Sequence, residues 1–265
     1  MGKRMQSNSK PLISIVTICF NSAKTIRKTI ESVLNQTYTN IEYILVDGAS
    51  IDDTVAIIKE YEQQFIAKGI IYRWISELDN GIYDALNKGI LLATGEWLGI
   101  IHSDDWYEAD ALEKLFITEA IEDYDLVYGL VKVIAQNNQI HSVEQKMFTS
   151  LPTDPMQHQG VFVKRKLHED IGLYSTSYKI AADYDFLLKC FLANKKAKFI
   201  LCVVASFSRV GISNSDKMAH ISVLETYQIL YRNGLISKTK LVLVGYVKVK
   251  LLWVLNQLRK CKRFL

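Results

Sequence analysis

Cysteine is scarce and scattered in this sequence. The four cysteines among 265 residues, Cys19, Cys190, Cys202 and Cys261, lie far apart and form no CxxC pair. We therefore expect neither a structural zinc site nor a disulfide framework, and a reducing cytosolic location. Residues 1–10 are polar and basic, and the apolar run after them is typical of a strand, so we expect no secretory signal.

Long apolar runs and proline-rich linkers are missing as well. The longest uninterrupted apolar run in the C-terminal stretch covers residues 241–247, whereas a transmembrane helix needs about 20 apolar residues. The chain has three prolines and no Pro/Gly/Ser stretch long enough to separate two domains. Its 49% hydrophobic and 23% charged residues are typical of a globular protein, so we expect one continuous domain.

Several familiar motifs are also absent. No GxGxxG follows the first apolar run, which disfavours dinucleotide binding of the dehydrogenase type. No Gly-Lys-Ser/Thr sequence occurs, which argues against a P-loop phosphotransferase, and no GxSxG marks a hydrolase nucleophile. The segment CFNSAKTI lacks the Gly-rich signature with a basic residue that a sugar-nucleotide pyrophosphorylase should carry.

Basic residues are concentrated at the C-terminal end. The net charge is +4, but residues 237–265 hold eight Lys/Arg and no Asp/Glu, which leaves 24 basic and 28 acidic residues elsewhere. An acidic body argues against a nucleic-acid-binding domain. We interpret 237–265 as a basic, apolar helix that contacts an anionic membrane, with Tyr246 and Trp253 facing lipid. Docking of this helix on the body or on a partner is the alternative.

The order of apolar segments predicts an α/β fold. Strands are predicted at 12–19, 41–46, 70–75 and 97–101, and helices at 24–36, 53–65 and 82–92. This alternation predicts a mostly parallel sheet flanked by helices on both faces. In the second half we expect an antiparallel pair of strands at 126–135 and 139–143, a strand at 161–164 and a helix at 183–192.

Acidic and amide side chains follow each of the four predicted parallel strands. These strand ends are Phe20-Asn21, residues 47–50, residues 77–81 and residues 103–105. Because ligands of open parallel sheets bind at the carboxyl ends of the strands, these residues predict a polar ligand site.

The adjacent carboxylates of Asp104 and Asp105 are the sharpest element of this site. Two neighbouring carboxylates after a buried strand repel each other unless a cation or a hydrogen-bond donor lies between them. Oxygen ligands suit Mg²⁺ or Mn²⁺, and a diphosphate would complete the coordination. Taken alone, such a pair is more often a solvated turn or a helix cap.

Six short motifs, in this order and spacing, resemble the family 2 inverting glycosyltransferases. They are residues 14–21 (SIVTICFN), 32–38 (SVLNQTY), 44–50 (ILVDGAS), 79–89 (DNGIYDALNKG), 95–97 (GEW) and 103–106 (SDDW). The resemblance extends over about residues 11–215, with later matches at 181–185 (AADYD) and 211–213 (GIS). It implies the GT-A fold and a role in bacterial surface-polysaccharide synthesis.

The resemblance also implies an organisation of the chain. A polar tail at 1–10 would precede a nucleotide-sugar-binding half at 11–106. The acceptor-binding and catalytic half would follow at 107–236, and the basic, membrane-proximal helix at 237–265.

The same resemblance assigns roles to the donor-site residues. Thr17, Phe20 and Asn21 would border the nucleotide, and Asp47 would hydrogen-bond the base, typically uracil. Asp104 would approach the ribose, and Asp105 would ligate Mn²⁺ or Mg²⁺ between the donor phosphates. In the 79–89 motif the residues expected near the donor phosphate or sugar are Asp79, Asp84 and Lys88. Each of those three is also compatible with a plain surface position.

An inverting transfer needs a carboxylate that takes the proton from the acceptor hydroxyl. In the family this base belongs to an acidic pair at a helix start that usually reads Glu-Asp. Here the pair reads Ala182-Asp183, so the resemblance implies Asp183 as the base. Asp185 is the second candidate, and an N-cap carboxylate is the structural alternative. His158 precedes the strand expected to border the acceptor cleft and is the best-placed histidine, although a lone histidine is more often structural.

The leading hypothesis is a glycosyltransferase that moves a single sugar from a UDP-sugar to a polyprenyl-diphosphate-linked glycan at the inner face of the cytoplasmic membrane. A processive relative would carry transmembrane helices and a Gln-x-x-Arg-Trp motif, and neither occurs in this sequence. The alternative is a non-catalytic nucleotide-sugar-binding component of a glycan-assembly complex. Loss of the acidic pair or of the base would favour that alternative, and both are present.

Overall fold

The computed structural model describes residues 10–117, 120–135, 137–208, 216–243, 247 and 250. In the first half, strands alternate with helices as the sequence predicts. These elements are β1 (Ile13–Cys19), α1 (Ile26–Leu34), β2 (Ile41–Asp47), α2 (Thr54–Glu60), α3 (Glu62–Ala67), β3 (Ile71–Ser76), α4 (Ile82–Leu92) and β4 (Trp97–Ile100). The single helix predicted at 53–65 forms two helices that meet at Tyr61. There the Tyr61 N–H bonds to the Ile58 carbonyl three residues back, as in a tight 3-10 turn.

The second half contains more elements than the sequence predicts. They are β5 (Trp106–Tyr107), α5 (Ala111–Phe116), β6 (Leu126–Ile134), β7 (Ile140–Glu144), η1 (Phe148–Ser150), η2 (His158–Gly160), β8 (Val161–Lys164), α6 (Leu167–Asp170), α7 (Ala182–Leu192), β9 (Ala197–Ser208) and α8 (Asp216–Arg232). The predicted antiparallel pair is confirmed as β6 and β7, in which Val131 lies opposite Glu144. The long strand β9 and the helix α8 had no clear sequence signal.

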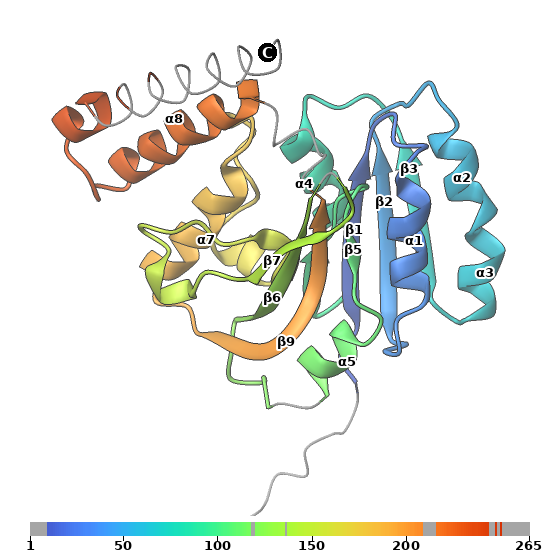
Figure 1. Ribbon diagram of the computed structural model, residues 1–265. Helices are drawn as coiled ribbons and strands as arrows, with labels where there is room; N and C mark the ends of the chain where they lie inside the picture. Colours follow the sequence, from blue (N-terminus) through green and yellow to red (C-terminus); the bar gives the residue numbers. More distant parts are fainter. Residues whose placement is uncertain are drawn as a thin grey trace, which may run out of the picture.

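One curled sheet joins the two halves of the chain (Figure 1). Within the described residues it has nine strands in the order β3-β2-β1-β4-β8-β6-β9-β5, with β7 paired to β6. The pairs β3-β2, β2-β1, β1-β4 and β6-β9 are parallel, whereas β8 runs antiparallel between β4 and β6. The prediction of a single α/β domain with a mostly parallel sheet flanked by helices is therefore confirmed.

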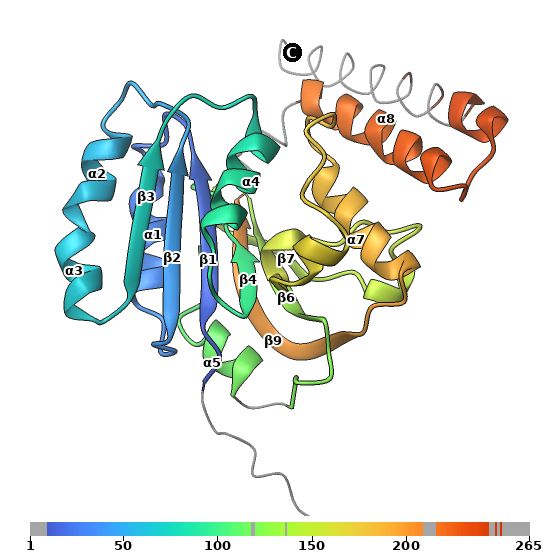
Figure 2. The same ribbon diagram turned by 180° about the vertical axis from the view of Figure 1, so that it is seen from behind.

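Helices cover both faces of the sheet, and each face has its own hydrophobic core. Side chains of α1, α2, α3 and α5 pack on one face. Side chains of α4, α7 and α8 pack on the other, and the two views in Figures 1 and 2 show this division of the helices. The acidic strand ends lie at the edge where β1, β2 and β3 terminate, beside the start of α4.

Three predicted features lie wholly or partly outside the described residues. They are the polar tail, of which only Lys10 is described, the motif at 211–213, and most of the predicted helix at 237–265. From that last segment, residues 238–243, 247 and 250 are described, and they are helical. The described part of the chain contains no helix with the length and hydropathy required to traverse a bilayer.

Candidate active site

The loops after β1, β2 and β3 meet because their strands are in parallel register. Cys19 lies opposite Asp47, and Asp47 lies opposite Ser76, so the three strands end side by side. Gly48 allows the closest approach, because a Cβ at this position would lie 2.5 Å from Asp79 Oδ2 and 3.5 Å from the Phe20 ring. The sequence prediction that these strand ends gather at one edge is thus confirmed.

Phe20 and Asn21 line the exposed side of this edge. The Phe20 ring is 58% exposed, which is unusual for a phenylalanine and leaves a flat apolar surface available for stacking. Asn21 adopts a left-handed backbone conformation (φ 49°), and its Oδ1 accepts the Ile51 N–H at 3.0 Å. Asn21 therefore ties the β1 loop to the β2 loop.

Thr17 and Asp47 lie beneath these loops. Both side chains are fully buried, and their described hydrogen bonds are to protein groups. Asp47 accepts the Ser76 hydroxyl at 2.7 Å, the Ser50 N–H at 2.9 Å and the Ser50 hydroxyl. Its described role is to fix the two neighbouring loops, and its predicted contact with a nucleotide base stays a prediction.

The segment before α4 is held by its own polar side chains. Asp79 Oδ1 accepts the Gly81 N–H at 2.9 Å, and Gly81 has the positive φ (113°) that the turn requires. Asp84 accepts the Asn80 N–H at 2.9 Å. Lys88 donates to the Leu78 carbonyl and pairs with Glu77, both at 2.8 Å, and the Glu77 hydrogen bond raises the pKa of Lys88. Of the three residues predicted at the donor phosphate or sugar, Asp79 thus lies in the loop before α4, and Asp84 and Lys88 lie in α4 and bond back to that loop.

Asp105 is a buried carboxyl group with two protein donors. Its side chain is 1% exposed, Oδ2 accepts Gln159 Nε2 at 3.0 Å, and Oδ1 accepts the Ser208 N–H at 2.8 Å. Burial, followed by the charge of Asp104, raises the pKa of Asp105 to about 7. Burial also raises the pKa of Asp104. A cation at this pair would offset a charge that the fold alone disfavours.

Asp183 lies in the first turn of α7 and has two partners from distant parts of the chain. Oδ1 accepts the Tyr83 hydroxyl at 2.9 Å, and Oδ2 lies 3.1 Å from His158 Nδ1. Burial alone would raise the pKa of Asp183, but the bonds from His158 and Tyr83 outweigh it and hold that pKa below its usual value. Burial alone would lower the pKa of His158, but the hydrogen bond and the negative charge of Asp183 outweigh burial and raise that pKa. Asp183 is therefore a carboxylate at neutral pH.

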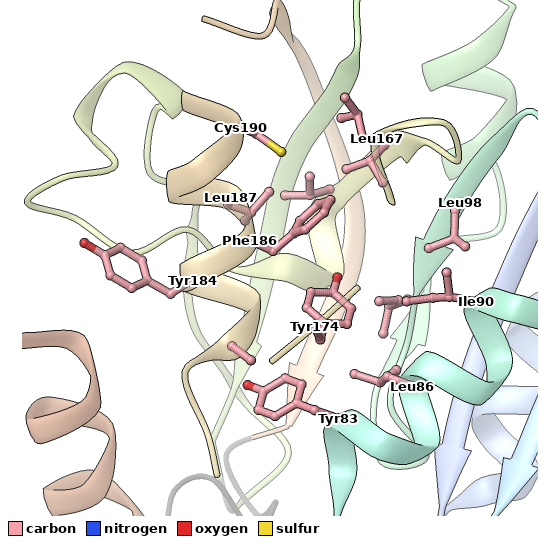
Figure 3. Packing of buried hydrophobic residues seen from close by; sticks show 14 of the residues in the cluster. Tyr83, Leu86, Ile90, Leu98, Leu167, Tyr174, Tyr184, Phe186, Leu187 and Cys190 are labelled. Atoms are coloured by element: carbon pink, nitrogen blue, oxygen red, sulfur yellow. The ribbon is translucent and has the colours of Figure 1, made fainter. Parts of the chain in front are cut away.

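Apolar side chains form the floor below Asp183. A small cavity beside Asp183 and His158 is lined otherwise by Leu98, Ile100, Val161, Val163, Tyr174 and Leu187. Figure 3 shows Tyr83 and Tyr174 between α4 and α7, and their ring centroids are 5.7 Å apart. This packing separates the Asp183 carboxylate from solvent on its inner side.

The two other predicted catalytic residues have different outcomes. The structure brings His158 to Asp183. Asp185 is 4% exposed and forms an ion pair with Lys189 one turn further along α7, at 2.7 Å. The assignment of the base to Asp183 or Asp185 stays a prediction. Of the two, Asp183 is the one whose carboxylate contacts His158 in η2.

The short helix η2 connects the two chemically distinct parts of the site. His158 in η2 contacts Asp183, and the next residue, Gln159, donates to Asp105. The Gln159 side chain is 3% exposed. Gln159 was missed in the sequence analysis. No sequence motif around this residue predicts a hydrogen bond to Asp105, which lies 54 positions earlier in the chain. One backbone segment thus fixes the spacing between a candidate metal ligand and a candidate base.

Comparison with known proteins identifies the family. The model of glycosyl transferase family 2 matches residues 14–178, and the chain belongs to this family. The matched range includes Asp105, His158 and Gln159 and ends shortly before Asp183.

Curated relatives agree with this family, and solved structures agree with the fold. A PGL/p-HBAD biosynthesis glycosyltransferase of Mycobacterium bovis is 35% identical over 214 residues, which cover 77% of this chain and 80% of that protein. The mannosyltransferase PcManGT from Pyrobaculum calidifontis, solved with GDP-Man and Mn²⁺, has a TM-score of 0.66 at 18% identity over 90% of this chain and 70% of its own. S. aureus TarS 1–349 with UDP-GlcNAc has a TM-score of 0.61 at 19% identity over 82% of this chain and 66% of its own. A longer TarS chain is matched over 42% of its length. These structures support the GT-A fold.

Proposed function

We propose that the chain is an inverting glycosyltransferase that transfers one sugar from a UDP-sugar to a lipid-linked oligosaccharide in bacterial surface-polysaccharide biosynthesis. The observation that carries the proposal is the joint placement of Asp105 and Asp183 by η2, beside the loops at the carboxyl ends of the strands. Such a site provides both a metal ligand and a base, the two groups that an inverting transfer requires.

The carboxyl pair fits a hard divalent cation, Mn²⁺ or Mg²⁺. Asp105 would ligate it, and Asp104, whose side chain is only partly exposed, would approach the ribose. No group of three or more His, Cys, Asp or Glu side chains clusters as a complete metal centre within the described residues. The protein would therefore supply few ligands, and donor phosphates and water the others. When bound, the metal stabilises the charge of the departing diphosphate.

The donor nucleotide would lie on the loops after β1 to β3. The exposed Phe20 ring offers a stacking surface, and Thr17, Asn21 and Asp47 shape the loops around it. Asp79 in the loop before α4, with Asp84 and Lys88 in α4, would face the phosphates or the sugar. Uracil as the base rests on the family resemblance, since the solved neighbours carry both UDP-GlcNAc and GDP-Man.

Asp183 would act as the base. Its carboxylate is ionised at neutral pH and is held by Tyr83 and His158, so that it can take the proton of an acceptor hydroxyl as the oxygen attacks the anomeric carbon. In the Asp185 alternative, the Lys189 ion pair would have to open first.

The proposal for the acceptor is based on the C-terminal segment. In its described part, Val242, Leu243 and Val247 are 54% to 61% exposed, beside the basic residues Lys238 and Lys240. Exposed apolar side chains among lysines are typical of a helix that contacts an anionic lipid surface. This pattern supports a polyprenyl-diphosphate-linked acceptor at the inner face of the cytoplasmic membrane.

The direct test is nucleotide release from a panel of UDP-, GDP- and dTDP-sugars by the purified protein, with Mn²⁺ and with EDTA. We expect slow release from one UDP-sugar that EDTA suppresses. Because an acceptor can be needed for turnover, binding of UDP, GDP and dTDP with and without Mn²⁺ is measured by calorimetry in parallel. A protein that binds no nucleotide under either condition would contradict the proposal, and metal-dependent binding without transfer to any glycan acceptor would favour the non-catalytic alternative.

Gln159→Leu is expected to weaken the metal site without removing a ligand. The variant loses the amide that donates to Asp105 Oδ2, and such outer-shell partners typically contribute about 10- to 100-fold to metal affinity. We expect the Mn²⁺ concentration for half-maximal UDP binding, measured by calorimetry, to rise by about that factor. Gln64→Leu, at an exposed position of α3, is the control. Unchanged Mn²⁺ dependence in Gln159→Leu would show that Asp105 is not the ligand that orders the metal.

A further inference from the structure

A glutamate of α8 holds the segment that leads into α7. Glu225 is 8% exposed, and its carboxylate accepts three consecutive backbone N–H groups. Oε1 accepts that of Lys179 at 2.7 Å, and Oε2 accepts those of Ile180 at 3.0 Å and Ala181 at 3.1 Å. Successive N–H groups that converge on one carboxylate form a concave anion site. Here the anion is part of the same chain.

The start of α7 has no side-chain cap from its own N-cap residue. Ala181 is the N-cap residue of α7, and its methyl side chain offers no oxygen to the free N–H groups at the helix start. The carboxylate of Glu225, which comes from another helix, accepts the N–H of Ala181 itself and those of the two residues before it, and its negative charge is favourable at a helix N-terminus. The position at which α7 begins is therefore set by α8.

A second contact holds the same segment on its other side. Arg232, at the end of α8, donates from Nη1 to the Tyr178 hydroxyl at 2.9 Å, and its guanidinium lies over the Tyr178 ring at 5.4 Å. Between the two polar contacts, Ile229 and Leu230 are buried in the hydrophobic core that α4 and α7 share. Thus α8 is packed into the body and fixes residues 178–181 at both ends.

Asp183 lies two residues beyond this clamp. Its carboxylate must meet Tyr83 from α4 and His158 from η2 at once, so a small displacement of the α7 start would break one of the two contacts. A carboxylate that is misplaced by about 1 Å typically costs about 100-fold in rate.

We propose that Glu225 is a positioning residue, which acts through the start of α7 to hold the Asp183 carboxylate in the geometry for proton transfer. The proposal rests on the function proposed above, in which Asp183 is the base. It gives α8 a part in catalysis.

Glu225→Gln tests the proposal with little change of shape. The amide oxygen can replace Oε2 toward Ile180 and Ala181, but the NH₂ group then faces the Lys179 N–H, donor against donor. We expect kcat to fall by about 10- to 100-fold, while the KM for the donor and the affinity for UDP with Mn²⁺ stay within about twofold of wild type. Gln228→Ala, at an exposed position three residues further along α8, is the matched control and should match wild type in both.

The outcomes separate this proposal from the proposed function. A wild-type protein with no transferase activity would refute the proposed function. Wild-type activity that Asp183→Asn removes and Glu225→Gln leaves unchanged would overturn the positioning role alone. An equal loss of kcat and of UDP affinity would also overturn it, because general loss of structure would then explain the effect. If Glu225→Gln does not fold, Tyr178→Phe decides: it removes the hydroxyl that Arg232 bonds, and unchanged kcat in that variant would contradict the clamp.

Discussion

Asp105→Asn should lower kcat by about 1,000-fold and at the same time stabilise the metal-free protein at pH 8. The loss of activity follows from the proposed metal, which contributes several kcal/mol to stabilisation of the leaving diphosphate, and each 1.36 kcal/mol corresponds to a factor of ten. The gain in stability follows from the burial of Asp105. Asparagine has the same shape, and Gln159 can turn its amide to present oxygen instead of nitrogen to the new NH₂ group.

The stability effect has a definite pH dependence. In the unfolded chain an aspartate loses its proton near pH 4, whereas the pKa of Asp105 in the folded protein is raised to about 7. The folded state therefore binds more protons between these values, and wild-type stability falls as pH rises from about 4 to about 7. Asp105→Asn has no carboxyl group to ionise at this position, so its stability does not fall in this way as pH rises. Its advantage should vanish below pH 4 and reach on the order of 2 to 4 kcal/mol at pH 8 in EDTA.

Thermal unfolding in EDTA at pH 4, 6 and 8, together with kcat in Mn²⁺, measures both effects. Asp123→Asn, at an exposed position, controls for removal of one negative charge elsewhere. A variant that is less stable than wild type at every pH would mean that Asp105 is held as a paired charge in the fold. A variant with full activity would exclude Asp105 as the metal ligand.

Asp183→Asn should lower kcat by about 100- to 10,000-fold, the range by which general-base groups contribute, without a change in UDP affinity. The unchanged affinity is expected because Asp183 contacts Tyr83 and His158, not the loops after β1 to β3. Asp185→Asn in the same helix is the matched comparison. It loses only the Lys189 ion pair, so its kcat should fall much less. A larger loss in Asp185→Asn than in Asp183→Asn would move the base to Asp185.

Asp183→Asn should also lose stability within a limited pH window. The lowered pKa of Asp183 contributes stability above about pH 4, which is lost as pH falls through the folded-state pKa. The raised pKa of His158 contributes stability below about pH 6.5, which is lost as pH rises through the folded-state pKa. The difference between wild type and variant in thermal unfolding should therefore be largest between about pH 4 and pH 6.5. A difference that is constant from pH 4 to pH 8 would mean that the two groups are not paired.

The sequence predicts the first half of the fold well because its signals are local. Segments such as β1 and β2 are short and mostly apolar and are separated by the amphipathic helix α1, and Asn21 and Asp47 lie at or just after their carboxyl ends. The second half depends on distant partners. Strand β9 mixes exposed and buried positions without regular alternation and is held by pairing with β6, some 70 residues earlier in the chain. Local pattern gives no access to such pairing.

The site shows the same division. The pair at 104–105 and the helix start at 183 are visible as motifs, whereas the residues that hold them are not. Gln159 supports Asp105 and Glu225 supports the start of α7 across 54 and about 45 positions of the chain. The burial of Asp47 could not be predicted from the sequence either. The position of Asp47 at the end of a strand predicts where its backbone lies, but not which hydroxyl groups bond to its carboxylate. Motif spacing thus predicts candidate reacting groups, and only the packed structure shows which residues hold them.

The hydrogen bonds of Asp105 also impose an order of assembly during synthesis. One partner, Gln159, is made 54 residues after Asp105, and the other, the Ser208 N–H, is made 103 residues after it. Strands β1 to β4 can pair while the chain is still emerging, because all four are complete once residue 100 has been made. Contacts of high sequence separation form late and slowly. A nascent chain that ends before Ser208 therefore has the loops after β1 to β3 before Asp105 has both of its hydrogen-bond donors. If the proposed function holds, a ribosome-bound or prematurely terminated product would bind the donor poorly and transfer no sugar.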